Sequence, residues 1–336
     1  LASVGAYVVG CSTTATDSAS VETTTLPPGV TTTTTALVGG PTTTLASGGG
    51  TSTVKLCFIH HSSGGNWLHN TDDEPETAGG LGASLNANNY YVTETDYAWF
   101  AGSVHLGYNT DFGFWTTWFT TTNMAYVYAN NSNYYYTNTI TNPGGENQIV
   151  MFKGCFPNSN LYGNPTDAAA TGATNLIQEQ TTGDDADQPA AYSVANCKWV
   201  YNQILEYCRA RPDKLFIAVT SPPRTAGHYV GANAANARAF NNWLVNDWLT
   251  GYSATGGVHN VAVFDFYNVL TDPDNHHRIS SGAVQHHTEV DSLNTAYYPT
   301  IAGGGDDHPN SAGNQKATTE FVPLLNYYYL RWQASR

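Results

Sequence analysis

Charged residues are scarce in this chain of 336 residues, since Asp, Glu, Lys and Arg together make up 11% of it. Basic residues are scarcest, with 12 Lys and Arg against 26 Asp and Glu and a net charge of −14. So little positive charge argues against a nucleic-acid backbone or an anionic membrane as partner. A surface rich in neutral Thr, Asn, Ser and Tyr is more typical of secreted proteins, so we expect an extracellular or cell-surface location.

Long apolar runs and paired-cysteine motifs are also missing. No run of about 20 apolar residues occurs, so the sequence predicts no membrane span. Without CxxC or CxxCH, zinc-ribbon and c-type haem sites are excluded. Five cysteines are an odd number, so at least one is free or pairs between chains. Cys57 and Cys155 are expected to be buried thiols, and Cys197 and Cys208 lie about 16 Å apart in one predicted helix, too far to bond.

The chain changes character near residue 51. Residues 1–50 carry runs of Thr and Gly with only two acids and no basic residue. Too poor in large apolar side chains to form its own core, this segment is expected to lie as strands along its own domain or along a neighbouring copy. Residues 51–336 form the folded domain. Assembly into a homo-oligomer or filament through residues 1–50 is therefore one predicted partnership.

Apolar runs alternate with helical patterns after residue 51. The predicted strands are Val54–His60, Tyr90–Thr95, Ile149–Lys153, Lys214–Thr220 and Val261–Asp265, and the predicted helices are Ser193–Ala210, Ala232–Leu249 and Ser311–Leu330. Strands that alternate with helices indicate βαβ units. The fold class is therefore α/β, a three-layer α/β/α sandwich around a mostly parallel five-stranded sheet.

Residues 97–147 fit this alternation poorly and are rich in aromatic residues, Asn and Thr. Their aromatic side chains either line a cleft or pack a satellite core, and packing is the favoured interpretation. Trp99, Trp115 and Trp118 are the residues that would serve as carbohydrate platforms if the chain bound sugars without catalysis.

Three stretches that carry reactive side chains lie where predicted strands end or where the last helix begins. Ser62 follows the first strand in FIHHSSGGNW, with Ser63 as the weaker alternative nucleophile, and KGCFPNSN follows the third strand. The loop GGGDDHPNSAG precedes the last helix and holds His308 directly after two acids. Reactive groups gather at the carboxyl ends of parallel strands, so we expect these stretches to meet.

A serine near the start and an Asp–His loop near the end resemble the SGNH (GDSL-type) hydrolase superfamily, here a divergent bacterial branch. His60-His61-Ser62 stands in place of the Gly-Asp-Ser triplet, and Asp306-Asp307-His308-Pro309 in place of the Asp-x-x-His-Pro loop. The resemblance covers about residues 54–330. It implies a flavodoxin-like sheet and a serine esterase that needs no cofactor and acts on a small ester or an acylated carbohydrate.

The resemblance also implies roles for individual residues. Ser62 would be the nucleophile, His308 the general base and Asp306 the acid that orients it. The N–H of Ser62 and the side chain of Asn158 would donate to the oxyanion, with Gly102 as the candidate third donor.

The chain departs from the family pattern at several of these positions. The family acid stands three residues before the histidine, where this chain has Gly305, so either Asp306 or Asp307 could serve. His61 replaces the usual Asp, and no acid follows Asn158.

Two other interpretations compete with an esterase. The pairs His60-His61, His276-His277 and His286-His287 suggest a metal site, but adjacent histidines on a strand face opposite ways, so no metal is expected. The Thr-rich extension alternatively suggests a structural subunit of an extracellular fibre or sheath that uses an SGNH-like fold.

Overall fold

The computed structural model describes residues 23–25, 31–37, 40–43, 52–70, 75–171, 192–229, 231–288, 294–300 and 306–336. The strands are β1 (Thr23–Thr25), β2 (Thr31–Leu37), β3 (Gly40–Thr43), β4 (Val54–Ile59), β5 (Tyr90–Thr95), β6 (Ile149–Lys153), β7 (Leu215–Val219), β8 (Val261–Phe264), β9 (His277–Ser280) and β10 (Ala283–His286). The α-helices are α1 (Ser62–Leu68), α2 (Leu81–Ala87), α3 (Trp115–Trp118), α4 (Thr121–Tyr128), α5 (Val194–Arg209), α6 (Asn233–Asn246), α7 (Phe266–Val269) and α8 (Ser311–Ser335). Short 3₁₀ turns are η1 (Phe112–Phe114), η2 (Phe156–Ser159), η4 (Ala226–His228) and η5 (Thr255–Gly257).

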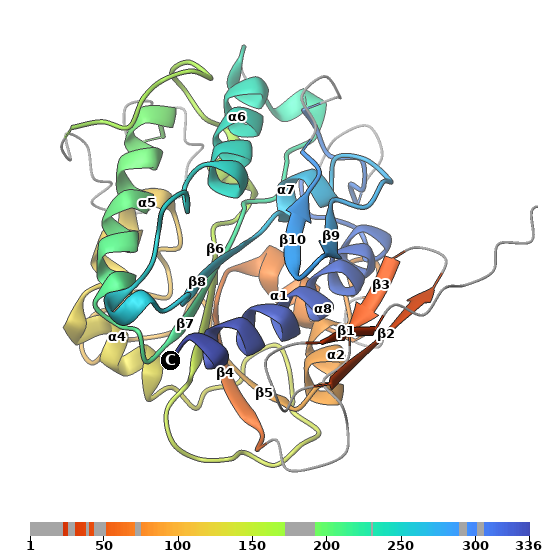
Figure 1. Cartoon of the computed structure of the whole chain (residues 1–336). Helices are drawn as coiled ribbons and strands as arrows, with labels where there is room; N and C mark the ends of the chain where they lie inside the picture. The colour runs from red at the N-terminus through yellow and green to blue at the C-terminus, as the bar shows by residue number, and fades with distance from the viewer. Residues whose placement is uncertain are drawn as a thin grey trace, which may run out of the picture.

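Five parallel strands form the central sheet in the order β5-β4-β6-β7-β8 (Figure 1). All five strands are apolar or buried runs, as expected for a sheet covered on both faces. The α/β prediction is confirmed, and each predicted strand matches its observed bounds to within one residue at each end. The chain runs outward from β4 to β5 and then returns past β4 to β6, so the strand order reverses between β4 and β6.

Side chains that alternate along the strands separate the core into two halves. Cys57 and Ile59 of β4 pack with the apolar residues of α3, α4, α5 and α6 on one face. Leu56 and Phe58 pack with α1, α2, α7 and α8 on the other face. These helices and the sheet make the three layers of an α/β/α sandwich (Figure 1).

The aromatic segment 97–147 contains η1, α3 and α4, none of which the sequence pattern predicted. Trp115 and Trp118 are fully buried in the core on the face of the sheet that α5 and α6 cover. Trp99 stacks on Trp118 with ring centroids 5.2 Å apart. The packing interpretation is confirmed for Trp115 and Trp118, which are therefore not available as carbohydrate platforms.

Two small antiparallel sheets lie outside the central one. Strands β9 and β10 form a hairpin between α7 and α8. Strands β1, β2 and β3 form a three-stranded sheet, and β3 lies alongside α8 and β9 (Figure 1). Where residues 1–50 are described, they are extended, as predicted; the rest of that segment lies outside the described residues.

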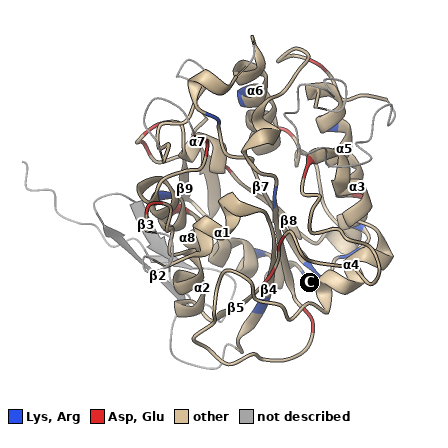
Figure 2. Ribbon diagram, turned by 180° about the vertical axis from the view of Figure 1, so that it is seen from behind, with Lys and Arg blue, Asp and Glu red and all other residues tan. Residues whose placement is uncertain are grey.

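Charged residues are few and scattered along the described ribbon (Figure 2). No helix among the described residues has the length and apolar character that crossing a bilayer requires. Cys57, Cys155, Cys197 and Cys208 are all buried free thiols. This confirms the prediction of buried thiols for Cys57 and Cys155, and Cys197 and Cys208 are not bonded to each other, as expected.

Candidate active site

The candidate active site lies at the carboxyl ends of β4 and β6, where the strand order reverses. Such a switch point leaves a crevice in which open α/β sheets bind their ligands. The end of β4 leads through His60 and His61 to Ser62, the first residue of α1, and the end of β6 leads to Lys153 and the η2 turn. The loop before α8 brings His308 to the same edge.

Ser62, His308 and Asp306 lie in one hydrogen-bonded chain. Asp306 Oδ1 accepts from His308 Nδ1 at 2.6 Å and from the His308 backbone N–H at 3.0 Å. These bonds place the proton of His308 on Nδ1, so Nε2 accepts the Ser62 hydroxyl at 2.7 Å. A nucleophile held by a base that is itself held by an acid is the arrangement of serine hydrolases.

Asp307, the other acid of the loop, points away from the histidine. Its Oδ1 accepts from the N–H and hydroxyl of Thr225 and from His228 Nδ1, and its Oδ2 pairs with Arg224 Nε at 2.9 Å. Burial raises the pKa of Asp307, but the hydrogen bonds and Arg224 outweigh burial and lower it overall. Of the two acids left open by the sequence, only Asp306 contacts His308. Gly305, the position of the family acid, lies outside the described residues.

Ser63 does not share the accessibility of Ser62. Its side chain is fully buried, whereas Ser62 is half-buried. The two glycines that follow let α1 approach closely, because a Cβ on Gly64 would lie 2.4 Å from His60 Cβ and one on Gly65 would lie 2.8 Å from the Tyr135 ring. The close approach fixes the start of α1, and with it Ser62, against the end of β4.

Tyr97 faces Ser62 from the end of the neighbouring strand β5. Its hydroxyl lies 3.5 Å from both the N–H and the Oγ of Ser62, the outer limit of a hydrogen bond. Burial raises the pKa of Tyr97, which keeps its hydroxyl protonated as a donor. The sequence reasoning missed Tyr97, although its place two residues after a strand end was a usable signal.

Asn158 lies on the η2 turn, and its side chain is fully buried. Its Nδ2 donates to Asp111 Oδ1 at 2.7 Å, and its Oδ1 accepts from the N–H of Phe112 at 2.9 Å. Burial raises the pKa of Asp111 to about 6 even though Asn158 donates to it. Asn158 therefore links the η2 turn to the loop at Asp111 and Phe112. No contact of the described residues joins Asn158 to Ser62.

Gly102 is likewise not brought to Ser62 by any contact of the described residues. It occupies a turn between Ala101 and Val104 with φ of 62°, and a Cβ there would lie 2.7 Å from the Tyr126 hydroxyl. The left-handed backbone explains the glycine without an oxyanion role. The hydroxyl of Tyr97, not Gly102, is the group that lies near the N–H and Oγ of Ser62.

The two histidines before Ser62 form hydrogen bonds to neighbouring segments of the chain. His61 Nε2 donates to the carbonyl of Gly107 at 2.7 Å, and its ring stacks on Tyr97 at 4.1 Å. Burial lowers the pKa of His61 to about 3, so it is neutral at pH 7. His60 Nε2 donates to Glu94 Oε2 at 3.0 Å, and Glu94 Oε1 accepts the backbone N–H groups of residues 134–136.

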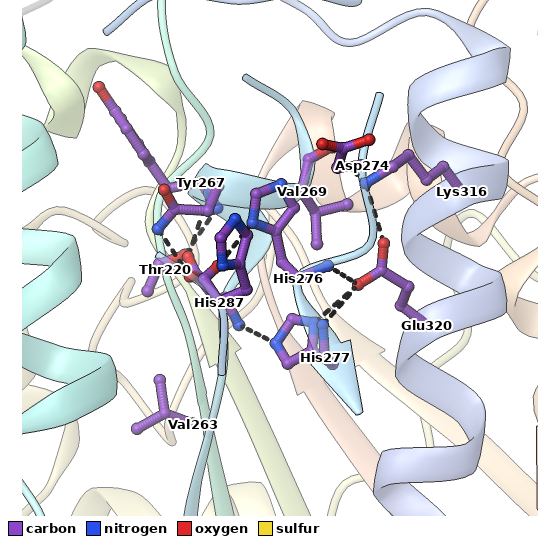
Figure 3. A network of polar contacts seen from close by, with 12 residues as sticks. Thr220, Val263, Tyr267, Val269, Asp274, His276, His277, His287, Lys316 and Glu320 are labelled. Carbon is purple, nitrogen blue, oxygen red and sulfur yellow. Dashed lines mark hydrogen bonds and ion pairs between the residues drawn. The ribbon is translucent and has the colours of Figure 1, made fainter. Parts of the chain in front are cut away.

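The second histidine pair lies in a polar network between β9, α7 and α8 (Figure 3). His277 Nδ1 donates to Glu320 Oε2 at 2.9 Å, and its Nε2 accepts the N–H of Asp265 at 3.1 Å. His276 donates to the carbonyl of His287 at 2.6 Å and to Asp272 at 3.0 Å. Their ring nitrogens are thus engaged by the protein, and within the described ranges no cluster of three His, Cys, Asp or Glu side chains could hold a metal ion.

Exposed aromatic rings lead from Tyr97 to the surface. We call Tyr97, Phe100, His105 and Tyr108 the aromatic rim. The ring of Tyr108 meets those of Tyr97 and His105 at 5.8 and 5.5 Å, and Phe100 stacks on His105 at 4.2 Å. Phe100 is 51% and Tyr108 42% exposed. The rim therefore exposes aromatic rings to solvent and reaches Ser62 through Tyr97.

Comparison with known proteins adds no relative: no protein-family model, no curated protein and no solved structure matches this chain.

Proposed function

We propose that this protein is a serine ester hydrolase of SGNH type. The observation that carries the proposal is the continuous chain Asp306–His308–Ser62, with bonds of 2.6 and 2.7 Å and a half-buried serine at a sheet switch point. These three residues come from opposite ends of the sequence, and a purely structural role does not require them to meet in this order.

In the proposed reaction, Ser62 Oγ attacks the carbonyl carbon of the ester while His308 Nε2 takes its proton. Asp306 holds the ring and stabilises its charged form. The negative oxygen of the tetrahedral intermediate accepts from the Ser62 N–H and from the Tyr97 hydroxyl, which lie 3.5 Å apart and can therefore both reach one oxygen placed beside them. His308 then protonates the departing alcohol, and water releases the acid from the acyl-enzyme by the same path.

The aromatic rim supports an acylated carbohydrate as substrate, alongside smaller esters. A sugar ring presents an apolar face of C–H groups that packs on exposed aromatic rings, and the rim begins at the nucleophile. A neutral ligand also suits a protein with few positive charges. An extracellular or cell-surface location, drawn from composition, is consistent with such a substrate and remains part of the proposal.

The test compares wild type with Ser62→Ala on p-nitrophenyl acetate and on acetylated xylan. We expect wild type to turn over both esters and Ser62→Ala to lose at least about 10³-fold in kcat. Ser84→Ala on α2 serves as the control, since Ser84 is also half-buried and no contact of the described residues joins its side chain to Ser62. Absence of wild-type turnover on both esters would reject the proposal.

A further inference from the structure

A fully buried lysine lies directly behind the nucleophile. Lys153 ends β6 and shares the strand face of Ile149 and Met151, which is the face covered by α1. Its Nζ donates to Ser63 Oγ at 2.5 Å and to the Gly154 carbonyl at 2.9 Å. Both partners are neutral, and among the described residues no carboxylate lies within ion-pair distance of Lys153.

A buried charge without a counter-charge is costly for folding, so its presence at this edge of the sheet calls for an explanation. Burial lowers the pKa of Lys153 to about 8, which leaves it mainly charged at pH 7. The ionisable groups that face it are Cys155 on its own loop and His61 at the start of α1, and His61 is neutral. From α7 only the ring of Phe266 approaches, at 5.7 Å.

The hydrogen bonds around Lys153 can all point in one direction. Because the lysine donates to Ser63 Oγ, the Ser63 hydroxyl is free to donate to Cys155 Sγ at 3.1 Å. The thiol of Cys155 can then donate to Ser62 Oγ, 3.7 Å away. In this series of hydrogen bonds, each group donates to the next one in the direction of Ser62 Oγ. A charged donor at the start of such a series polarises the hydrogen bonds that follow.

We propose that Lys153 is a positioning residue that acts through Ser63 and Cys155 to stabilise negative charge on Ser62 Oγ. The inference rests on the proposed esterase function. We call the hydrogen-bonded series from Lys153 through Ser63 and Cys155 to Ser62 the relay. The relay also gives a function to the buried polar side chains of Ser63 and Cys155, which take no part in the triad of Ser62, His308 and Asp306.

The experiment measures how fast a fluorophosphonate probe labels Ser62 between pH 6 and pH 10, together with melting temperature. We expect Lys153→Met to label about tenfold more slowly at pH 7, a smaller effect than the loss of a direct oxyanion donor. Wild-type labelling should decline above about pH 8 relative to that of Lys153→Met, as the lysine loses its charge. Loss of an unpaired buried charge should leave melting temperature unchanged or higher.

Lys55→Met is the matched control. Lys55 is also buried and also donates to neutral oxygens, those of Asn131 and Gly145. It lies near the start of β4, however, at the amino ends of the parallel strands, whereas Ser62 lies beyond their carboxyl ends. We expect its labelling rate to equal that of wild type. Ser63→Ala interrupts the relay while keeping the lysine, so it should also label slowly if Lys153→Met does not fold.

Equal rates and equal pH profiles for wild type and Lys153→Met would overturn the inference, as would a wild-type rate in Ser63→Ala. These results would leave the esterase proposal intact. A wild type that takes no label at any pH would instead overturn both.

Discussion

Asp306 and Asp307 are neighbours in sequence with separate surroundings, which allows a matched test at the residue scale. Asp306→Asn removes the negative charge beside His308 Nδ1 and introduces an amide N–H₂ that favours the other tautomer, so we expect kcat to fall by about 10²–10⁴-fold with little change in melting temperature. Steady-state kinetics on p-nitrophenyl acetate and thermal unfolding measure the two effects. An Asp306→Asn enzyme with wild-type kcat would contradict the assignment of the triad acid.

Asp307→Asn should show the reverse pattern, with a loss of stability as the primary effect. It leaves Arg224, whose side chain is 11% exposed, without its counter-charge, and the cost is at most the roughly 3–5 kcal/mol of a fully buried pair. Because the folded-state pKa of Asp307 is lowered, its contribution is present above the unfolded pKa and is lost as pH falls through the folded one. The stability difference between wild type and variant should therefore shrink in acid, and a constant difference would count against the pairing.

Ser62 and His308 could be predicted from sequence because each stands at a boundary that apolar patterns mark, the end of a strand and the start of a helix. The choice between Asp306 and Asp307 could not, since it depends on which carboxylate the loop turns toward Thr225. Tyr97 and Lys153 were missed for a related reason. Their places beside Ser62 and Ser63 depend on contacts between residues far apart in the sequence, and the pattern of one sequence does not reveal such contacts.

At the scale of elements, Glu320 ties the β9–β10 hairpin to α8, because it accepts the backbone N–H groups of His276 and His277 and the Nδ1–H of His277 (Figure 3). Lys316, one turn earlier on α8, also donates to Glu320. Burial raises the pKa of Glu320, but His277 and Lys316 outweigh burial and lower it to about 2. This contribution is present above the unfolded pKa and is lost as pH falls toward 2. We expect Glu320→Gln to lower the melting temperature at pH 7 and to matter progressively less between pH 4 and pH 2.

Glu206→Gln on α5 is the control for that measurement, because Glu206 is exposed and pairs with exposed Arg209. An exposed pair of this kind contributes little to the free energy of unfolding. Equal effects of the two substitutions would show that the network around Glu320 does not hold the hairpin.

The aromatic rim makes a prediction about substrate binding. Phe100→Ala removes the outermost ring, and the loss of an aromatic contact costs about 1 kcal/mol, roughly fivefold in KM. We expect that rise for acetylated xylan, with p-nitrophenyl acetate turnover unchanged. Tyr134→Ala, at 63% exposure but outside the rim, is the control. A KM that is unaffected by Phe100→Ala would separate the rim from substrate binding.

The central strands were predictable because each is a continuous apolar run flanked by helical periodicity. The β9–β10 hairpin was not, since its residues show no clear alternation and its hydrogen bonds to Glu320 come from another element, α8. Helix α4 was also missed, because its Thr, Asn and Tyr residues are poor helix formers. Of its eight residues, Met124, Val127 and Tyr128 are buried in the core.

On the scale of the whole molecule, the question is whether residues 1–50 serve the site or an assembly. The esterase proposal assigns the chemistry to residues 51–336, so deletion of residues 1–50 should leave p-nitrophenyl acetate turnover within about twofold of wild type. A large loss of turnover would show that the extension supports the catalytic domain. The fibre-subunit alternative predicts instead that the deletion abolishes assembly in negative-stain images, and an unchanged assembly would reject it.

The central claim is that Ser62, activated by His308, is the nucleophile of this fold. The most direct measurement is to label the full chain with a fluorophosphonate and to locate the adduct by fragmentation of the peptide that spans residues 54–70. The account predicts an adduct on Ser62 in wild type, at least about 10³-fold slower labelling in His308→Ala, and none in Ser62→Ala. An adduct on Ser63, or labelling that is indifferent to His308, would contradict it.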